Sequence, residues 1–264
     1  MQNDDQQVGR ILSRREALVL LGAAGASLIA GCSAGQTSSA TAGTTSDASP
    51  ASTTNANNAS TASAPGCVVR PAETAGPYYV DEKLNRSDIR SDPSDGSVRD
   101  GAPLELTFNV SQLAKGACAP LAGAIVDVWH CDAQGVYSDV RDPTFFDTRG
   151  KRFLRGYQVT DASGRATFKT IYPGWYEGRT IHIHFTIRTN PTAAAAHEFT
   201  SQIYFDDSLN DKVLAQKPYS SKGKRTMTNE QDGIFRENGK ELILAVQPVG
   251  AGYAGTFDIA LQTA

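Results

Sequence analysis

A strand-like segment at residues 180–188 places the tightest constraint on the fold. Its sequence, TIHIHFTIR, alternates polar and apolar residues without a break. Successive side chains of a β-strand point to opposite faces, so the isoleucines and the phenylalanine face a core while His182 and His184 project side by side from the other face. Two imidazoles arranged in this way can share one metal ion, and the chain has only four histidines.

The same β-rich pattern recurs along the chain after Cys67. Short runs lie at residues 104–110, 124–130, 153–159, 166–171, 199–205, 241–248 and 254–262. Clusters of Gly, Asp and Asn that are typical of turns separate them. This alternation of strands and turns predicts an all-β domain over residues 67–264, a two-sheet β-sandwich with long loops. The polar stretch 206–232 is expected to be surface loop with one short helix.

The first 32 residues have the features of an export signal. Arg14 and Arg15 precede an uncharged stretch that is too short to span a bilayer as a helix and that ends in the residues IAGC at Cys32. The arginine pair indicates the twin-arginine route, and the small residues before Cys32 resemble a bacterial lipobox, in which the cysteine is acylated. We expect a protein of the cell envelope, periplasmic or on the outer surface, that meets the membrane only through this lipid anchor. A buried amphipathic helix is the alternative.

Residues 33–66 are rich in Ser, Thr and Ala, with Asp47 as the only charge. Such a segment cannot offset its ordering entropy by burial, so we expect a disordered linker, with a sugar-bearing stalk as a second interpretation. The net charge of the chain is -3 and no long basic run is present. Neither nucleic acid nor an anionic lipid surface is therefore expected as a partner, and a small ligand is favoured.

Three cysteines remain if Cys32 is lipidated: Cys67, Cys118 and Cys131. An odd number in an oxidising compartment is most simply explained by one disulfide and one free thiol. Cys118 and Cys131 lie at opposite ends of one predicted strand, too far apart to bridge directly. Cys67 is thus expected to pair with one of them, and the sequence leaves open which one.

Several aromatic and charged residues flank the histidine strand. Residues 172–179, YPGWYEGR, carry Tyr176 and Arg179 just before it, Tyr137 follows the turn after 124–130, and Gln202 opens the segment QIYF. With TAGPYY at 74–79, this order resembles the catalytic core of the intradiol ring-cleavage dioxygenases, the family of protocatechuate and catechol dioxygenases. The resemblance covers about residues 67–260.

The resemblance implies a non-haem iron(III) enzyme whose metal ligands are Tyr137, Tyr176, His182 and His184. Ferric iron favours anionic oxygen, and coordination to it deprotonates a phenol. The implied reaction uses O2 to cleave a catechol-type aromatic diol between its two hydroxyl-bearing carbons, giving a muconate-type dicarboxylic acid.

Further roles follow from the same resemblance. Tyr176 is implied to leave the metal and accept a substrate proton, and Arg179 to stabilise negative charge that develops on the ring. Gln202 is a candidate for positioning the migrating oxygen. The candidate walls of the substrate pocket are Pro77, Tyr78 and Trp175. Two other aromatics, Trp129 and Tyr204, are expected to belong to the core instead, and His130 and His197 are expected to be structural or surface residues.

The chain also departs from the family that it resembles. Only five residues separate Tyr176 from His182, fewer than in protocatechuate dioxygenases. A shorter loop at this position suggests a more open substrate pocket. No helical N-terminal domain of the kind in cytoplasmic catechol dioxygenases is found, so their mode of dimerisation is not carried over, and a homodimer stays open as the assembly.

Two rival functions fit parts of the pattern. A tethered β-sandwich module could bind a carbohydrate or peptide by stacking it on Trp129, Trp175 and Tyr176. A zinc hydrolase could use His182 and His184 with an acidic third ligand, for which Glu177 or Asp139 would have to serve. Metal analysis separates the three: iron for the dioxygenase, zinc for the hydrolase and no metal for the module.

Overall fold

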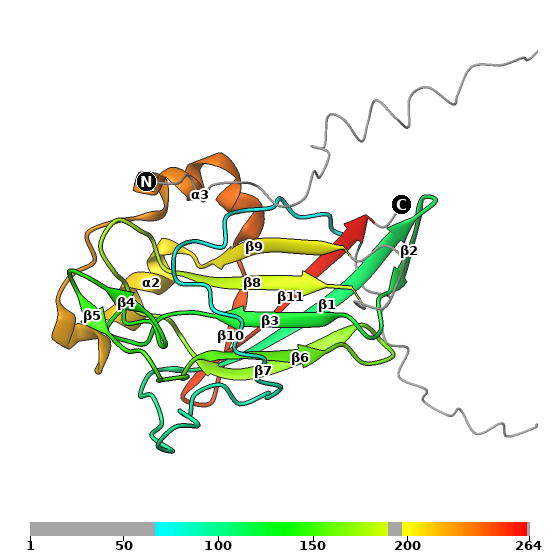
Figure 1. Ribbon diagram of the computed structural model, residues 1–264. Coiled ribbons are helices and arrows are strands. Elements are labelled where there is room, and N and C mark those ends of the chain that lie inside the picture. The colour runs from blue at the N-terminus through cyan, green and yellow to red at the C-terminus, as the bar shows by residue number, and fades with distance from the viewer. Residues whose placement is uncertain (1–66, 190–196, 263–264) are drawn as a thin grey trace, which may run out of the picture. The chain divides into compact units, whose positions relative to one another are not determined.

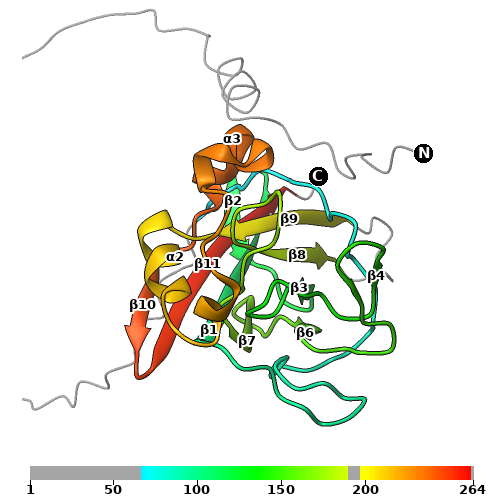
Figure 2. The ribbon, with the colours of Figure 1, turned by 90° about the vertical axis from the view of Figure 1, so that its left-hand side faces the viewer.

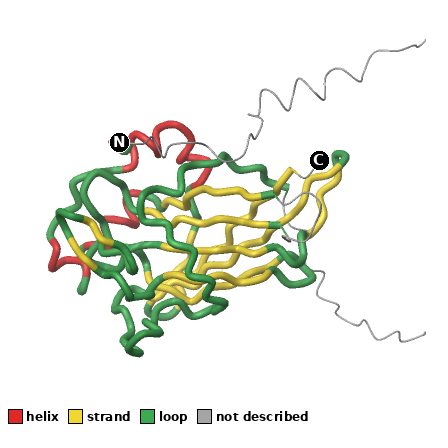
Figure 3. The backbone as a smooth tube through the Cα atoms, viewed as in Figure 1, coloured by secondary structure: helices red, strands yellow, loops and turns green. Residues whose placement is uncertain are grey.

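The structure is a computed structural model that describes residues 67–189 and 197–262. The predicted signal peptide (1–32) and linker (33–66) lie outside these residues. Two β-sheets dominate the fold, as predicted (Figures 1 and 3). The first has the order β10-β11-β1-β2, with β7 also paired to β1, and the second has the order β6-β3-β8-β9. The strands of these sheets are β1 (Pro103–Ala114), β2 (Ala117–Pro120), β3 (Ile125–Trp129), β6 (Arg155–Val159), β7 (Arg165–Ile171), β8 (His182–Arg188), β9 (Glu198–Tyr204), β10 (Val246–Val249) and β11 (Gly252–Gln262).

The two sheets enclose an aromatic core. Phe108 of β1 is at its centre, with its ring centroid 5.2 Å from that of Phe185 on β8 and 6.0 Å from that of Phe257 on β11. Phe185 belongs to the apolar face of the segment 180–188, and Ile183 and Ile187 are fully buried beside it. The alternation in the sequence therefore predicts correctly which face of β8 enters the core.

The opposite face of β8 is covered as well. The chain from Cys67 to Arg86 crosses this outer face, donating from the backbone N of Glu73 to Thr200 O on β9 and from that of Arg86 to Tyr157 O on β6. Figure 1 shows this segment, in cyan, passing over the four-stranded sheet. His182 and His184 are for this reason buried, although they point away from the core between the sheets.

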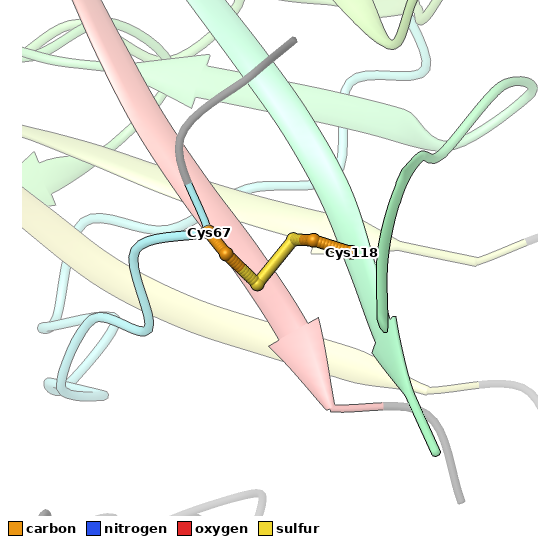
Figure 4. Close-up of a disulfide and its surroundings, with 2 residues drawn as sticks. All are labelled: Cys67 and Cys118. Atoms are coloured by element: carbon orange, nitrogen blue, oxygen red, sulfur yellow. A yellow bond between two sulfur atoms is a disulfide. The ribbon is translucent and has the colours of Figure 1, made fainter. Parts of the chain in front are cut away.

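A disulfide ties the start of the covering segment to the first sheet. Cys67 is bonded to Cys118 on β2, with the Cα atoms 5.7 Å apart (Figure 4). Cys131 is buried with a free thiol. One disulfide and one free thiol were expected, but Cys118 and Cys131 do not terminate one strand: Cys118 lies within β2 and Cys131 follows β3.

Helices and a small hairpin gather at one end of the second sheet (Figures 1 and 2). They are α2 (Asp207–Leu214), α3 (Gly233–Asn238), the 3-10 helices η1 (Tyr219–Lys222), η2 (Asn229–Gln231) and η3 (Gly239–Leu242), and the strands β4 (Arg141–Asp142) and β5 (Phe146–Asp147). Two predictions are wrong here. The run 241–248 is a strand only from Val246, because η3 occupies its start. The stretch 206–232 has one α-helix but is not all surface, since Val213, Tyr219 and Asn229 are buried.

In the part of the chain that the structure describes, no helix has the length and hydropathy needed to cross a membrane.

Candidate metal centre

His182 and His184 face one another at the start of β8. Their Nε2 atoms are 3.0 Å apart and both side chains are only 2% exposed. The Nδ1 of His182 lies 2.7 Å from the carbonyl oxygen of Thr180, which can only accept, so the proton of this imidazole sits on Nδ1. Its Nε2 is therefore unprotonated and has a free lone pair that can bind a metal ion. This nitrogen points at His184, as in metal sites where a backbone carbonyl fixes the tautomer.

Two tyrosine hydroxyls converge on the same nitrogen. The hydroxyl of Tyr176 lies 3.2 Å and that of Tyr137 3.4 Å from His182 Nε2. Tyr137 is fully buried, and its carbonyl accepts the hydroxyl proton of Thr148 at 2.6 Å. Tyr176 comes from the turn before β8 and is only partly buried. The structure thus brings all four predicted ligands, from three separate segments, to one point.

A bound cation explains the arrangement of these four side chains better than hydrogen bonds among them do. His182 Nε2 has one lone pair, yet three potential donors surround it: two hydroxyls and His184 Nε2. Burial, followed by the charge of Arg179, holds the pKa of both His182 and His184 well below the usual range, so both are neutral. Burial also raises the pKa of Tyr176 to about 12 and that of Tyr137 well above its usual value. Two neutral imidazoles and two phenols, which a hard trivalent cation would deprotonate, form a donor set that fits iron(III).

The acidic ligand that a zinc hydrolase needs is not near this cluster. Glu177 is exposed, and Asp139 accepts a hydrogen bond from Gly150 N at 2.6 Å. Within 67–189 and 197–262, no group of three or more His, Cys, Asp and Glu side chains is placed to hold a metal. The geometry therefore does not favour the hydrolase.

Trp129 and Gly76 enclose the His184 ring. Trp129, at the end of β3, stacks on it with centroids 5.1 Å apart and planes at 3°. Trp129 is 1% exposed, which agrees with its prediction as a core aromatic and leaves no surface for stacking a sugar. Gly76 has φ +68°, and a Cβ atom there would lie 3.3 Å from His184 Cε1. The tryptophan is nevertheless part of the site, since it fixes the plane of a candidate ligand.

Arg179 is held from two sides. Its Nε donates to Asp232 Oδ2 at 2.9 Å, and its Nη2 donates to Gln202 Oε1 at 2.7 Å and to Tyr204 Oη at 3.3 Å. Burial alone would lower the pKa of this guanidinium, but Tyr176, Tyr204 and Asp232 raise it above the usual value. A fixed, fully charged guanidinium therefore lies beside the tyrosine and histidine cluster.

Gln202 is fully buried and both ends of its amide are engaged. Its Oε1 accepts from Arg179, and its Nε2 donates to Thr74 O at 3.0 Å. Tyr204 is also buried, as predicted for a core aromatic, but it shares this network through its hydroxyl. Gln202 thus lies beside Arg179, and both ends of its side-chain amide are hydrogen-bonded to other residues of the protein.

The three predicted pocket residues lie in different surroundings. Tyr78 packs against both site tyrosines, with ring centroids 4.7 Å from Tyr137 and 6.1 Å from Tyr176, and its hydroxyl donates to Asp142 at 2.6 Å. Pro77 is exposed next to it. Trp175 is 8% exposed and packs in the main core, where its Nε1 donates to Gly223 O. Tyr78 therefore borders the cluster and Pro77 is its exposed neighbour in the chain, whereas Trp175 supports the segment that carries Tyr176.

Sequence reasoning missed two acidic residues of the site. Asp232 lies in the stretch expected to be loop, where no local pattern distinguishes its carboxylate from its neighbours. Glu73 contacts Tyr204, and its position directly before the TAGPYY segment was the one available signal. His130 is fully buried between Cys131 O (2.8 Å) and Thr170 Oγ1 (2.6 Å), in agreement with a structural role.

Known proteins resemble this chain in both sequence and fold. The family model described as Dioxygenase matches residues 74–262. The structure of an intradiol ring-cleavage dioxygenase from Tetranychus urticae has 35% sequence identity and a TM-score of 0.64, and the match covers 74% of this chain and 95% of that one. The dioxygenase domain of a dioxygenase and carbohydrate-binding protein fusion from Streptomyces sp. SirexAA-E has 28% identity and a TM-score of 0.51, with 75% and 100% covered.

The curated relatives match over a shorter span. Chlorocatechol 1,2-dioxygenase from Pseudomonas sp. (strain P51) is 31% identical over 106 residues, which are 33% of this chain and 39% of the relative. Catechol 1,2-dioxygenase 1 from Acinetobacter lwoffii is 28% identical over 155 residues, 50% of this chain and 45% of the relative. The chain thus matches less than half the length of either. The family match over 74–262 and the 35% identity across nearly the whole Tetranychus urticae structure show that this chain belongs to the intradiol ring-cleavage dioxygenase family.

Proposed function

We propose that this protein is a non-haem iron(III) dioxygenase that cleaves catechol-type rings between the two hydroxyl-bearing carbons and forms muconate-type dicarboxylic acids. The convergence of two phenol oxygens on two facing imidazole nitrogens carries this proposal. Membership of the family, and relatives named chlorocatechol and catechol 1,2-dioxygenase, support it.

Tyr137, Tyr176, His182 and His184 would hold the iron. When bound, iron(III) supplies the electron-withdrawing charge that makes a catecholate ring reactive toward O2. The chain's own residues supply the rest of the chemistry, namely proton acceptance, charge stabilisation and orientation.

Tyr176 is the better suited of the two tyrosines to act as a base. It is partly exposed and two residues before Gly178, which has φ +85° in an exposed turn, whereas Tyr137 is fully buried. A phenolate at Tyr176 Oη can thus move out and take a proton from a substrate hydroxyl, which a phenolate at Tyr137 could not do without rearranging the core.

Arg179 would stabilise negative charge on the substrate ring. Its two hydrogen-bonded edges leave it little freedom, so the positive charge is oriented before the substrate arrives. Gln202 would act by holding this guanidinium and by orienting a substrate oxygen. Tyr78 and Pro77 would form the wall on which the aromatic ring rests.

Export and anchoring are part of the proposal. The arginine pair, the short apolar stretch and the residues before Cys32 support twin-arginine export and a lipid on Cys32. Labelled fatty acid should be incorporated into the wild-type protein in cells but not into Cys32→Ser; equal labelling of both would contradict the anchor.

Product analysis under labelled oxygen tests the reaction. The iron-loaded protein, given catechol and ¹⁸O2, should form a muconic acid that carries one labelled atom in each carboxyl group. A ring-opened aldehyde would indicate cleavage outside the diol, and no consumption of catechol by protein with a full complement of iron would contradict the proposed function.

A further inference from the structure

We propose that Glu73, in its protonated form, is a positioning residue that orients Gln202 and Arg179 through the hydroxyl of Tyr204. The inference rests on the proposed function, since it assigns a role within the same site. It concerns a residue that touches neither the candidate ligands nor the surface on which a substrate would lie.

Glu73 is fixed to the sheet that carries the site. Its backbone N donates to Thr200 O on β9 at 3.0 Å, and its Oε2 lies 2.6 Å from the hydroxyl of Tyr204, the last residue of the same strand. Tyr204 Oη lies 3.2 Å from Gln202 Oε1, and Arg179 Nη2 lies 2.7 Å from that same oxygen. A continuous chain of contacts therefore connects Glu73 to the guanidinium.

The number of protons available in this series of contacts determines whether Glu73 is protonated. Gln202 Nε2 donates to Thr74 O, which fixes Oε1 as the end that faces Tyr204 and Arg179. Tyr204 has one hydroxyl proton but two acceptors within reach, Glu73 Oε2 and Gln202 Oε1. Each contact can be a full hydrogen bond with its own proton only if Glu73 carries a proton and donates it to Tyr204, so that Tyr204 donates onward to Gln202. An ionised Glu73 would accept the hydrogen bond of the Tyr204 hydroxyl, and Gln202 Oε1 would then accept from Arg179 alone.

The surrounding charges also favour the neutral acid. Arg179 is already paired with Asp232, and the negative charge of Asp232 offsets part of the effect of Arg179 on a second carboxylate. Glu73 Oε1 is buried and has no hydrogen-bond partner among the described residues. Burial raises the pKa of Glu73 from 4.5 to about 8; the hydrogen bond of Tyr204 and the charge of Arg179 oppose this, while Asp232 and Glu237 add to it. At neutral pH the acid is protonated.

Three variants of the full-length chain separate positioning from simple packing. Glu73→Gln keeps a neutral donor next to Tyr204, Glu73→Ala removes it, and Glu82→Gln is the matched control. Glu82 also has a buried oxygen without a hydrogen bond, and its pKa is raised to about 7 by burial, but its neighbours are Arg152 and Asp139. All three are compared with the wild type after iron loading.

Turnover of catechol is measured from pH 6 to pH 10. We expect wild-type kcat to fall as Glu73 ionises near pH 8. The kcat of Glu73→Gln should not show this fall, and the kcat of Glu73→Ala should be about ten- to hundred-fold lower than that of the wild type at every pH. Glu82→Gln should follow the wild type. An active wild type with Glu73→Gln and Glu73→Ala matching it in rate and pH profile would overturn the proposal.

A second readout does not depend on turnover. In the metal-free protein, a folded-state pKa of about 8 against 4.5 when unfolded means that the folded state binds the extra proton between these values. Wild-type stability relative to Glu73→Gln should therefore fall as pH rises from about 4.5 to about 8 and stay level above that. A constant difference in melting temperature across this range would refute protonation of Glu73 even if the enzyme proved inactive. An inactive, iron-loaded wild type that shows the expected trend would instead count against the proposed function alone.

Discussion

At the scale of single residues, the two site tyrosines differ in how tightly the fold holds them. Tyr137 is fully buried and its backbone is tied to Thr148, whereas Tyr176 is partly exposed on a turn. Under the proposed function, Tyr137 is therefore suited to remain on the iron and Tyr176 to leave it.

This difference makes Tyr176→Phe a direct test of the base. We expect turnover of catechol to fall by about 10²-fold or more, because the substrate proton loses its acceptor, and the colour of the iron-loaded protein to change. Tyr157→Phe, at a partly exposed tyrosine on β6, is the control and should do neither. Unchanged turnover in Tyr176→Phe would remove this residue from the ligand set.

Gly76 tests how closely the covering segment fits the site. A Cβ atom there would lie 3.3 Å from Cε1 and 3.7 Å from Nε2 of His184, so Gly76→Ala should weaken iron binding by displacing the imidazole. Gly96 has a similar φ of +74° with no atom within 4 Å of such a Cβ. Gly96→Ala carries the same backbone strain, of about 1 kcal/mol, without the contact. Equal iron affinity in the two variants, measured by competition with a chelator, would contradict this role.

At the scale of elements, one carboxylate joins α3 to Arg179. Asp232 is the N-cap of α3 and accepts from Ile234 N at 2.8 Å, while its other oxygen binds Arg179 and the backbone N of Thr180. The helix and the start of β8 are thus held by a single side chain.

Asp232→Ala should consequently affect stability and turnover together. Loss of the cap costs about 1 kcal/mol, and loss of the charged hydrogen bond to the partly buried guanidinium adds about 2 kcal/mol. Asp206, which caps α2 by accepting from Ser208 N at 2.8 Å, offers the matched control, since Asp206→Ala loses only a cap. Denaturant unfolding and turnover are measured for both; a similar small loss in the two variants would show that the pair with Arg179 contributes little.

The elements also show what the sequence can predict and what it cannot. The alternation at 180–188 is a local pattern, and it predicted both the buried face of β8 and the pairing of the histidines on the other face. The resemblance added Tyr137, Tyr176 and Arg179 through motif order. Asp232 and Glu73 reach their partners across 53 and 131 residues, so their roles depend on tertiary packing that leaves no local trace. The start of 241–248 has the composition of a strand but is the 3-10 helix η3, which packs against β9.

At the scale of the whole described chain, the disulfide secures the segment that covers the site. Cys67 and Cys118 are 51 residues apart, and Cys67 begins the stretch that carries Glu73, Gly76 and Tyr78 across the second sheet. Closing a loop of this length restricts the unfolded chain, and on that basis stabilises the fold by about 4 kcal/mol.

The double variant Cys67→Ser/Cys118→Ser should lower the free energy of unfolding, measured in denaturant, by up to about 4 kcal/mol. Iron affinity should fall with it, because the covering segment is released at one end. Cys131→Ser is a poor control since it is buried beside the site, so the reduced wild type is compared instead. Stability that is the same before and after reduction would contradict the role of the disulfide.

The central claim is that two phenolates and two imidazoles hold iron(III) at one point and that catechol displaces one phenolate. The visible absorption spectrum of the iron-loaded protein, recorded before and after adding catechol without oxygen, tests it most directly. A coloured protein whose band shifts to longer wavelength with catechol is the predicted result. A protein that contains iron but is colourless and does not respond to catechol would contradict the claim.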